Sequence, residues 1–272
     1  MKTMIRAALL ASACSLTAGM VHATSLQVTI ENLSEEDGLY LTPFLNVFHD
    51  GSYAGFQEGS AASSQLEAIA EEGMVGGEIE RINNLGINAQ TAVATGPQGF
   101  GSQPGQPPVL DAGEVTTFVI ELDPSDNRYY SFLSMVIPSN DTFVGNGNPL
   151  AYELFDDQGA FTNLSDILVD ANDIWDGGTE ENDGLGAAFS AAGGVATETV
   201  GGVVTQSGVD FLFGQPTVAG FDVDGNAVGR ALASISFEEV APVPLPAALP
   251  LLLAGLGAMG LTSRRRSQRA KS

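Results

Sequence analysis

Acidic side chains follow two apolar runs of the sequence at the point where each run ends. Asp141 comes shortly after residues 130–137, and Asp176 and Glu180 come shortly after residues 167–169. Such runs are typical of buried strands, and the loops of a β-sandwich cluster at its two ends. If these two loops share an end, the three carboxylates can converge on one hard cation, which takes oxygen ligands. The sequence therefore predicts a metal site made of Asp141, Asp176 and Glu180.

The acidic residues of this region also have a simpler interpretation. Asp141 at a strand end can accept hydrogen bonds from its own backbone in an Asx turn. Asp170 and Asp173 precede Asp176 at intervals of three residues, but the strand-like run before them and the glycines after Asp176 indicate a loop rather than one face of a helix. We therefore expect Asp170 and Asp173 to be solvated charges.

Catalytic residue types are scarce. The histidines are His22, close to the N-terminus, and His49, which has Asp50 and Ser52 as sequence neighbours. A triad depends on geometry rather than on sequence proximity, so this turn does not predict a nucleophile. The sequence contains no phosphate-binding glycine loop and no His/Cys metal cluster. We predict that the protein is not an enzyme.

Charge is distributed unevenly along the chain. All 33 acidic residues lie between Glu31 and Glu239, whereas seven of the 10 basic residues lie near the two ends. The arginines within the acidic part are Arg81, Arg128 and Arg230, so its net charge is −30. Such a surface repels nucleic acid and anionic membranes and is compatible with divalent cations. For most of these carboxylates, a salt-adapted or simply soluble secreted surface is the better explanation.

The N-terminal segment has the layout of a secretory signal peptide. Residues 1–23 combine a basic start, an apolar run and a small-residue exit at Ala23. A lipobox ending at Cys14, the only cysteine, is the alternative. After cleavage at Ala23 the chain would hold no disulfide and no thiolate metal site.

The C-terminal segment, residues 241–272, has three parts. A proline-containing motif at 243–247 precedes an apolar stretch at 249–261 and an arginine cluster at 264–266. The apolar stretch is near the short limit for a transmembrane helix, and the arginines would keep the end of the chain in the cytoplasm. The layout resembles the bacterial PEP-CTERM class of sorting signals. That resemblance implies processing by an exosortase-type enzyme and delivery to the cell envelope or extracellular matrix. A single-pass anchor is the alternative.

Residues 24–240 predict one all-β domain, an antiparallel β-sandwich with one short helix at 64–72. We expect that helix to be capped by Ser63 or Ser64 and to lie across one end of the sandwich. Pro43 predicts an edge strand or a bulge, residues 123–128 a hairpin turn, and residues 83–113 a long loop. The predicted strands are residues 25–31, 39–48, 115–122, 129–137, 150–155, 165–169, 210–213 and 231–237.

The domain also carries a series of short motifs. They are VTIENLS at 28–34, LTPF at 41–44, FHDGS at 48–52, GSAAS at 59–63, LEAIAE at 66–71, SMVIPSNDTFVG at 134–145 and WDGGTE at 175–180. In this order they resemble the spondin N-terminal (F-spondin) domain family in its bacterial form. The resemblance covers residues 25–185 and is weaker up to residue 240. It implies a C2-like β-sandwich with a calcium site, which in animal members belongs to secreted matrix and adhesion proteins.

The resemblance also implies which residues bind calcium. The metal-binding aspartates of the family match Asp141 and Asp176, and Glu180 stands where the family has another aspartate. Thr142 replaces an aromatic residue of the animal proteins, and their cysteines are absent, so their disulfides are too. A further acidic ligand would fall near Glu121 or Asp123, and ligation by Asp170 or Asp173 stays open.

Together these features predict a secreted, surface- or matrix-directed calcium-binding protein of adhesion or structure. Its surface partner is not identified by the sequence, and the C-terminal segment would provide its contact with the membrane. One alternative is a carbohydrate-binding module, with Trp175, Tyr129 and Tyr130 as candidate aromatic contacts. A carboxylate-dependent hydrolase is the other alternative.

Overall fold

The computed structural model describes residues 23–97 and 108–241. The expected signal peptide, apart from its last residue, and nearly all of the expected sorting segment with its apolar helix lie outside these residues. The described residues up to Glu239 belong to one compact unit. Among the described residues, no helix has the length and hydropathy needed to cross a membrane.

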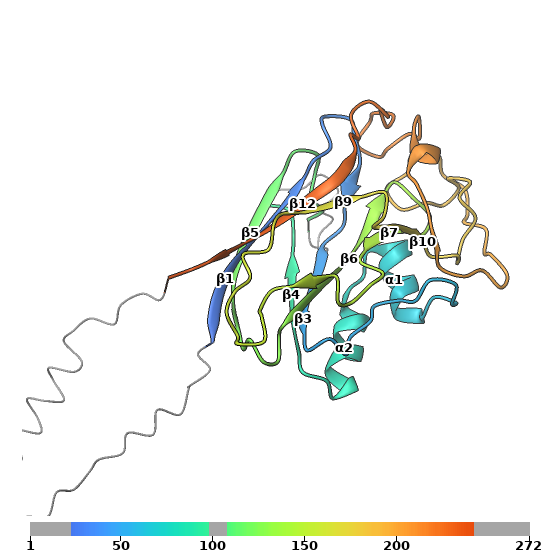
Figure 1. Ribbon diagram of the computed structural model, residues 1–272. Helices are drawn as coiled ribbons and strands as arrows, with labels where there is room; N and C mark the ends of the chain where they lie inside the picture. Colours follow the sequence, from blue (N-terminus) through green and yellow to red (C-terminus); the bar gives the residue numbers. More distant parts are fainter. Residues whose placement is uncertain (1–22, 98–107, 242–272) are drawn as a thin grey trace, which may run out of the picture. The chain divides into compact units, whose positions relative to one another are not determined.

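The described chain is mostly β-structure in two antiparallel sheets, as the sequence predicts (Figure 1). The smaller sheet has the strand order β5-β1-β12-β9, and the larger one has the order β11-β10-β7-β6-β3-β4, with β2 and β8 also paired to β6. The strands of the smaller sheet are β1 (Thr24–Asn32), β5 (Val115–Leu122), β9 (Ile167–Asp170) and β12 (Ala231–Glu239). Those of the larger sheet are β2 (Tyr40–Leu41), β3 (Phe44–His49), β4 (Ala89–Ala94), β6 (Tyr129–Ile137), β7 (Thr142–Gly145), β8 (Tyr152–Glu153), β10 (Ile174–Asp176) and β11 (Thr205–Gln206).

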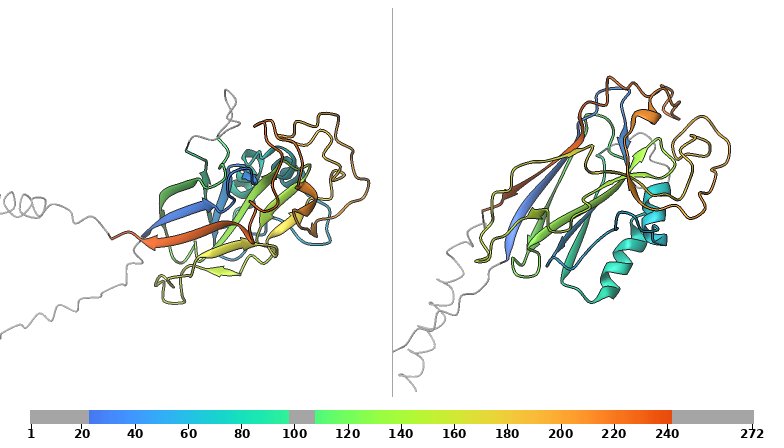
Figure 2. Two further views of the ribbon diagram at one scale, coloured as in Figure 1. Left: turned by 90° about the horizontal axis from the view of Figure 1, so that it is seen from above. Right: turned by 45° about the vertical axis from the view of Figure 1, so that its right-hand side comes forward.

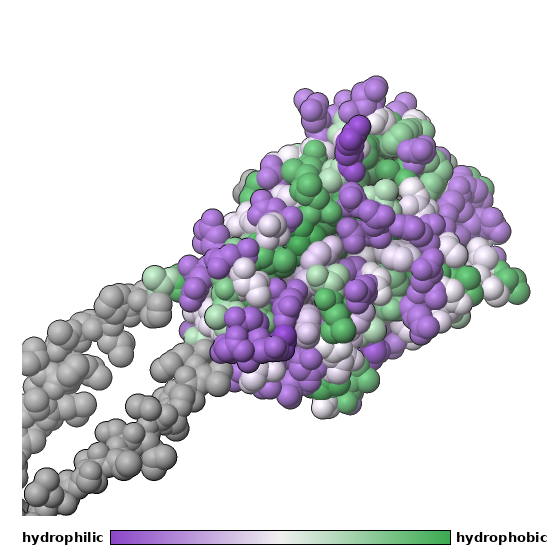
Figure 3. All heavy atoms as spheres, viewed as in Figure 1, coloured by the Kyte–Doolittle hydropathy of each residue, from purple (hydrophilic) through white to green (hydrophobic). Residues whose placement is uncertain are grey.

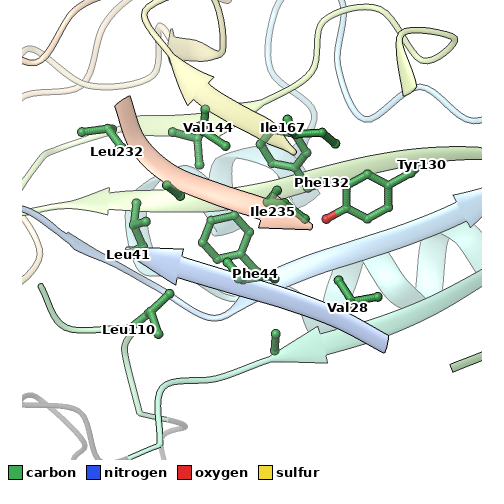
Figure 4. Close-up of a cluster of buried hydrophobic side chains, with 14 of the residues drawn as sticks. Val28, Leu41, Phe44, Leu110, Tyr130, Phe132, Val144, Ile167, Leu232 and Ile235 are labelled. Atoms are coloured by element: carbon green, nitrogen blue, oxygen red, sulfur yellow. The ribbon is translucent and has the colours of Figure 1, made fainter. Parts of the chain in front are cut away.

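Side chains from both sheets form one buried cluster, here called the inter-sheet core (Figure 4). In β1, Leu26, Val28 and Ile30 are fully buried and alternate with half-buried residues, as expected for a strand with one face on a core. They meet aromatic side chains of the larger sheet, including Phe44 and Tyr130. This core holds the two sheets against each other because it removes the apolar faces of both from water.

Two helices cover the other face of the larger sheet. Helices α1 (Ser64–Glu72) and α2 (Gly76–Leu85) supply apolar residues to a second buried cluster, which also contains Leu45 and Val47 of β3. Phe44 of the same strand points into the inter-sheet core. Strand β3 is therefore covered on both faces, which explains its nearly continuous apolar sequence.

Helix α1 forms where the sequence predicts it. Ser63 is its N-cap and accepts a hydrogen bond from the Leu66 backbone at 3.2 Å, and Gly73 ends it in the left-handed conformation. Its position differs from the expected one, because its apolar face packs on β6 and β7 instead of lying across the end of the sheets.

Several other expectations are wrong. The segment expected to be a long loop contains the end of α2 and all of β4. Residues 123–128 do not form a hairpin turn, because β5 pairs with β1 in the smaller sheet while β6 belongs to the larger one. Residues 210–213, expected as a strand, contain the 3-10 helix η1 (Asp210–Leu212). Pro43 separates β2 from β3, and β3 lies inside the sheet rather than at its edge.

The unit has two distinct ends along the strands. Leu26, near the start of β1, lies opposite Glu239, the last residue of β12, and both views of Figure 2 place the two strands side by side. Strand β6 runs from this end, where Tyr130 contacts Phe237, to Ile137 at the other end. Asp141 follows there, so we call this second end the acidic end.

Candidate functional site

Asp141 is fully buried, and only one of its two carboxylate oxygens accepts hydrogen bonds from the described residues. Its exposed fraction is 0 %. Oδ2 accepts hydrogen bonds from the backbone N–H groups of Thr179 at 2.8 Å and Glu180 at 3.1 Å, and lies 3.2 Å from the Thr179 hydroxyl. Oδ1 has no hydrogen-bond partner within residues 23–97 and 108–241. A buried carboxylate oxygen without a partner is costly, so this atom calls for a ligand.

The sheet brings the two predicted acidic loops together. Strand β10 pairs with β7 so that Asp176 lies directly opposite Thr142, the residue after Asp141. The backbone N–H of Gly177 also donates to the Asp141 carbonyl at 3.0 Å. The condition on which the sequence interpretation depends, that both loops share one end of the sheets, is therefore met.

A glycine fixes the path of the second loop. Gly178 has a φ of +68°, and a Cβ atom at this position would lie 2.5 Å from the carbonyl oxygen of Val203. Any other residue would be strained in this conformation and would also collide with the neighbouring segment. Because Thr179 and Glu180 follow directly, this close approach sets the position of the two N–H groups that bind Asp141.

Asp176 lies close enough to Asp141 for their charges to interact. Burial raises the pKa of Asp176, and the Asp141 carboxylate raises this pKa further. Hydrogen bonds from the Gly178 backbone and the Asn182 side chain oppose this shift. Two neighbouring carboxylates at a partly buried position repel each other, and a divalent cation would relieve this repulsion.

Glu180 contacts Asp141 mainly through its backbone. Its carboxylate accepts a hydrogen bond from the Asn140 side chain at 3.2 Å, while its backbone N–H donates to Asp141. Burial raises the pKa of Glu180, the Asn140 hydrogen bond lowers it, and the charges of Glu198 and Asp141 raise it. The third predicted carboxylate is therefore adjacent to the site but is held by Asn140.

Glu71, at the end of α1, belongs to the same region and was not predicted. Its pKa is raised to about 7, mainly by burial, while the nearby Thr179 side chain opposes the shift. Its Oε1 has no hydrogen-bond partner in the part of the chain that the structure describes. A hydroxyl carries one proton, so Thr179 can donate to Glu71 or to Asp141 but not to both. In the sequence, the only sign of this contact is the amphipathic pattern of α1, because it directs one face of the helix toward β7.

The further acidic residues lie elsewhere or behave differently from expectation. Glu121 and Asp123 lie at the end of β5 that pairs with Ser25 and Thr24, which is the end opposite Asp141. Asp173 is not a solvated charge, because only 9 % of it is exposed. Its pKa is raised to about 6, first by burial and then by the charge of Asp170, while hydrogen bonds from the Asp170 segment and Tyr152 oppose the shift.

Cationic side chains are scarce in the described residues, which contain no lysine. Two of the three arginines in the described chain are paired elsewhere, Arg81 with Glu78 and Arg128 with Glu153 and Asp157. No cluster of three or more His, Cys, Asp or Glu side chains with metal-binding geometry occurs in residues 23–97 and 108–241. The buried Oδ1 of Asp141 and the nearby Asp176 carboxylate are oxygen donors of the kind that calcium takes.

His49 is buried in a network that does not activate a nucleophile. Its Nδ1 accepts a hydrogen bond from the Gly51 backbone at 3.1 Å, so the proton of the neutral ring is on Nε2. Nε2 lies 3.0 Å from Ser131 Oγ and therefore donates to it. A general base must accept the serine proton, so this arrangement is structural. Burial lowers the pKa of His49 to about 4, against the opposing effect of Asp50.

The aromatic residues proposed for glycan binding are mostly inside the protein. Trp175 is 6 % exposed, donates its indole N–H to the Gly145 carbonyl at 2.7 Å and packs edge-on against Phe56. Tyr130 is fully buried, and Tyr129 is half-buried. A sugar-binding platform needs exposed rings, and Trp175 and Tyr130 do not provide one.

No protein-family model matches the chain, and a search of curated proteins finds no match either. The resemblance to the spondin N-terminal family therefore stays a prediction from sequence.

Proposed function

We propose that the protein is a secreted, surface- or matrix-directed calcium-binding protein with an adhesive or structural role, built on a C2-like β-sandwich. The observation that supports this proposal best is Oδ1 of the fully buried Asp141, which has no hydrogen-bond partner among the described residues. Asp176 lies opposite Thr142, the residue after Asp141, and its carboxylate adds negative charge beside Asp141.

Calcium would act as a link between two loops. Asp141 and Asp176 belong to different strand ends, and a cation bound by both carboxylates would neutralise their repulsion and fix the loops relative to each other. The backbone N–H groups of Thr179 and Glu180 hold Oδ2, which leaves Oδ1 for the cation. A rigid acidic end would then present a constant surface to a partner.

Export and delivery are part of the same proposal. The signal-peptide pattern at residues 1–23 would direct secretion, and residues 241–272 would be processed by an exosortase-type enzyme or kept as a membrane anchor. The surface of the described residues carries many hydrophilic side chains, as the face seen in Figure 3 illustrates. Its net charge argues against nucleic acid as a partner.

A thermal melt of the full-length protein, with calcium and then with chelator, tests the calcium site. A ligand at about 100 times its dissociation constant adds roughly 2.7 kcal/mol, which for a domain of this size raises Tm by about 5–10 °C. The shift should be larger with calcium than with magnesium. Asp141→Asn and Asp176→Asn should each remove it.

Asp166→Asn is the matched control, because Asp166 is exposed at the start of β9, away from the acidic end. This variant should keep the calcium shift of the wild-type protein. A wild-type Tm that calcium leaves unchanged, or a shift that persists in Asp141→Asn, would contradict the assignment of the site.

A further inference from the structure

A hollow of about 620 Å³ opens at the acidic end between three chain segments. It is lined by Glu36, Asp37, Tyr40, Asp111, Ala112, Ala219, Gly220 and Phe221. None of these residues belongs to the proposed calcium site. The small residues Ala112, Ala219 and Gly220 leave space beside the two aromatic rings.

The walls of the hollow are held by backbone hydrogen bonds. The Glu35 N–H donates to the Ala227 carbonyl at 2.7 Å, and the Asp224 N–H donates to the Asp37 carbonyl at 2.9 Å. Behind them, the side chain of Asn32 donates to the carbonyl of Leu110 at 3.0 Å. These bonds tie the segments that form the walls to one another, so the shape exists before a ligand arrives.

Aromatic rings form one side of the hollow. Tyr40 and Phe221 meet edge to face, with centroids 5.7 Å apart and an interplanar angle of 81°. Both side chains are only partly buried. Aromatic rings attract organic cations through their negative faces, and Arg side chains also stack on them.

Carboxylates make the hollow strongly negative. Glu36, Asp37 and Asp111 line it, and none of the described residues that line it is an arginine. The pKa of Tyr40 is raised to about 12, first by burial and then by the charges of Asp111, Asp37 and Glu114. Three carboxylates thus act on the Tyr40 hydroxyl in addition to its burial.

The chemistry favours an organic cation over a metal ion. A metal ion needs several oxygen atoms converging on one point. Carboxylates spread around an aromatic pair suit a larger cation whose charge is delocalised. We propose that this hollow binds an arginine side chain presented by a basic segment of a partner protein.

The proposal does not depend on the calcium site, because it uses different residues and no metal. The probe is acetyl-Gly-Arg-Gly-amide, and its neutral counterpart carries citrulline, which keeps the shape of arginine without the charge. Binding of each peptide to the full-length protein is measured by saturation-transfer-difference NMR at low salt in the presence of chelator. The arginine peptide should bind, and the citrulline peptide should bind about tenfold more weakly.

Two variants locate the binding. Glu36→Gln combined with Asp37→Asn removes two charges of the hollow, and Asn tolerates the φ of +66° at position 37. Phe221→Leu keeps the charges but removes a ring. Each variant should weaken the arginine peptide by about three- to tenfold. The matched control, Glu121→Gln with Asp166→Asn, removes two exposed charges elsewhere and should change the affinity by less than about twofold.

Thermal melts of all variants verify that each one is folded. Equal binding of arginine and citrulline peptides, unchanged binding in both hollow variants, or an equal loss in the control would overturn the proposal. Binding that requires calcium would overturn it as well, because the hollow should act without metal. Failure of the calcium melt alone would leave this result unaffected, so the two proposals fail separately.

Discussion

Thr179 contacts the carboxylate of Asp141 twice, because its backbone N–H and its hydroxyl both lie within 3.2 Å of Asp141 Oδ2. Glu180 adds a third donor at 3.1 Å. One oxygen of the buried aspartate thus organises the loop that follows β10, while the other oxygen has no hydrogen-bond partner in residues 23–97 and 108–241. A single side chain therefore combines a structural role with the ligand-binding role that we propose.

Asp141→Ala should be much less stable than Asp141→Asn when calcium is absent. Alanine leaves two backbone N–H groups without an acceptor, which costs about 2–3 kcal/mol, whereas asparagine keeps an acceptor oxygen and costs less than about 1 kcal/mol. Urea unfolding in chelator, followed by the fluorescence of Trp175, measures both. Equal stability of the two variants would mean that these hydrogen bonds do not hold the loop.

Gly178→Ala should destabilise the protein and reduce its calcium response. The added Cβ would lie 2.5 Å from the Val203 carbonyl oxygen at a positive φ, so the segment that carries Thr179 must move. We expect a loss of about 2–4 kcal/mol from strain and overpacking. Gly113→Ala is the matched control, since Gly113 has a similar φ of +73° but open space around its Cβ position, and it should cost about 1–2 kcal/mol. Urea titrations of both variants, with and without calcium, give the comparison.

His49 should make the protein less stable as the pH falls. Burial lowers its pKa to about 4 in the folded protein, whereas the unfolded chain has a value near 6.5. Between these values the unfolded state binds more protons, so stability is complete above pH 6.5 and is lost as the pH falls toward 4. The loss is on the order of 3 kcal/mol. His49→Gln should remove this part of the pH dependence, and a profile unchanged from the wild type would contradict the assignment.

Asp173 should make the protein less stable as the pH rises, over a pH range similar to that of His49. Its pKa is raised to about 6, so between pH 3.8 and 6 the folded state binds more protons, and stability falls as the pH rises through this window. Asp173→Asn should therefore be more stable than the wild type at pH 7.5, on the order of 1 kcal/mol after allowance for solvent screening. Near pH 3 the advantage should vanish. Urea unfolding at both pH values tests this, and an advantage at pH 3 as large as that at pH 7.5 would disprove it.

Local sequence patterns predicted the strands and the helix α1 that have clear signals. The alternation of Leu26, Val28 and Ile30 identifies β1, and the cap at Ser63 identifies α1. Helix α2 escaped prediction because two glycines begin it and its N-cap, Val75, makes no side-chain cap hydrogen bond. Strand β4 is an edge strand with few buried residues, so its sequence gives only a weak signal.

Local sequence patterns did not predict which helices and sheets pack against each other. The continuous apolar sequence of β3 is compatible with several environments, and only the packing of α1 and α2 on its second face explains it. Residues 123–128 cross from one sheet to the other, and this connection is as short as a hairpin turn. Length alone therefore does not distinguish a crossing between sheets from a hairpin.

The site was predicted in part. Asp141 and Asp176 were placed together by the rule that loops meet at the ends of sheets, and the pairing of β7 with β10 confirms it. Sequence could not tell that Glu180 uses its backbone for Asp141 and its carboxylate for Asn140, because this depends on the exact turn at Gly178. Glu71 approaches from a helix distant in sequence, so no spacing rule could include it.

The position of Glu239 has a mechanical consequence. Strand β12 ends there, opposite Leu26, and seven residue pairs join it to β1 along its length. A pull on Glu239 against a contact made at the acidic end would run parallel to the strands, and the hydrogen bonds between strands are perpendicular to them. Such tension loads the whole ladder in shear rather than opening it one bond at a time. If the chain is tethered at this point, the sheet lies between the tether and the partner and resists stretching.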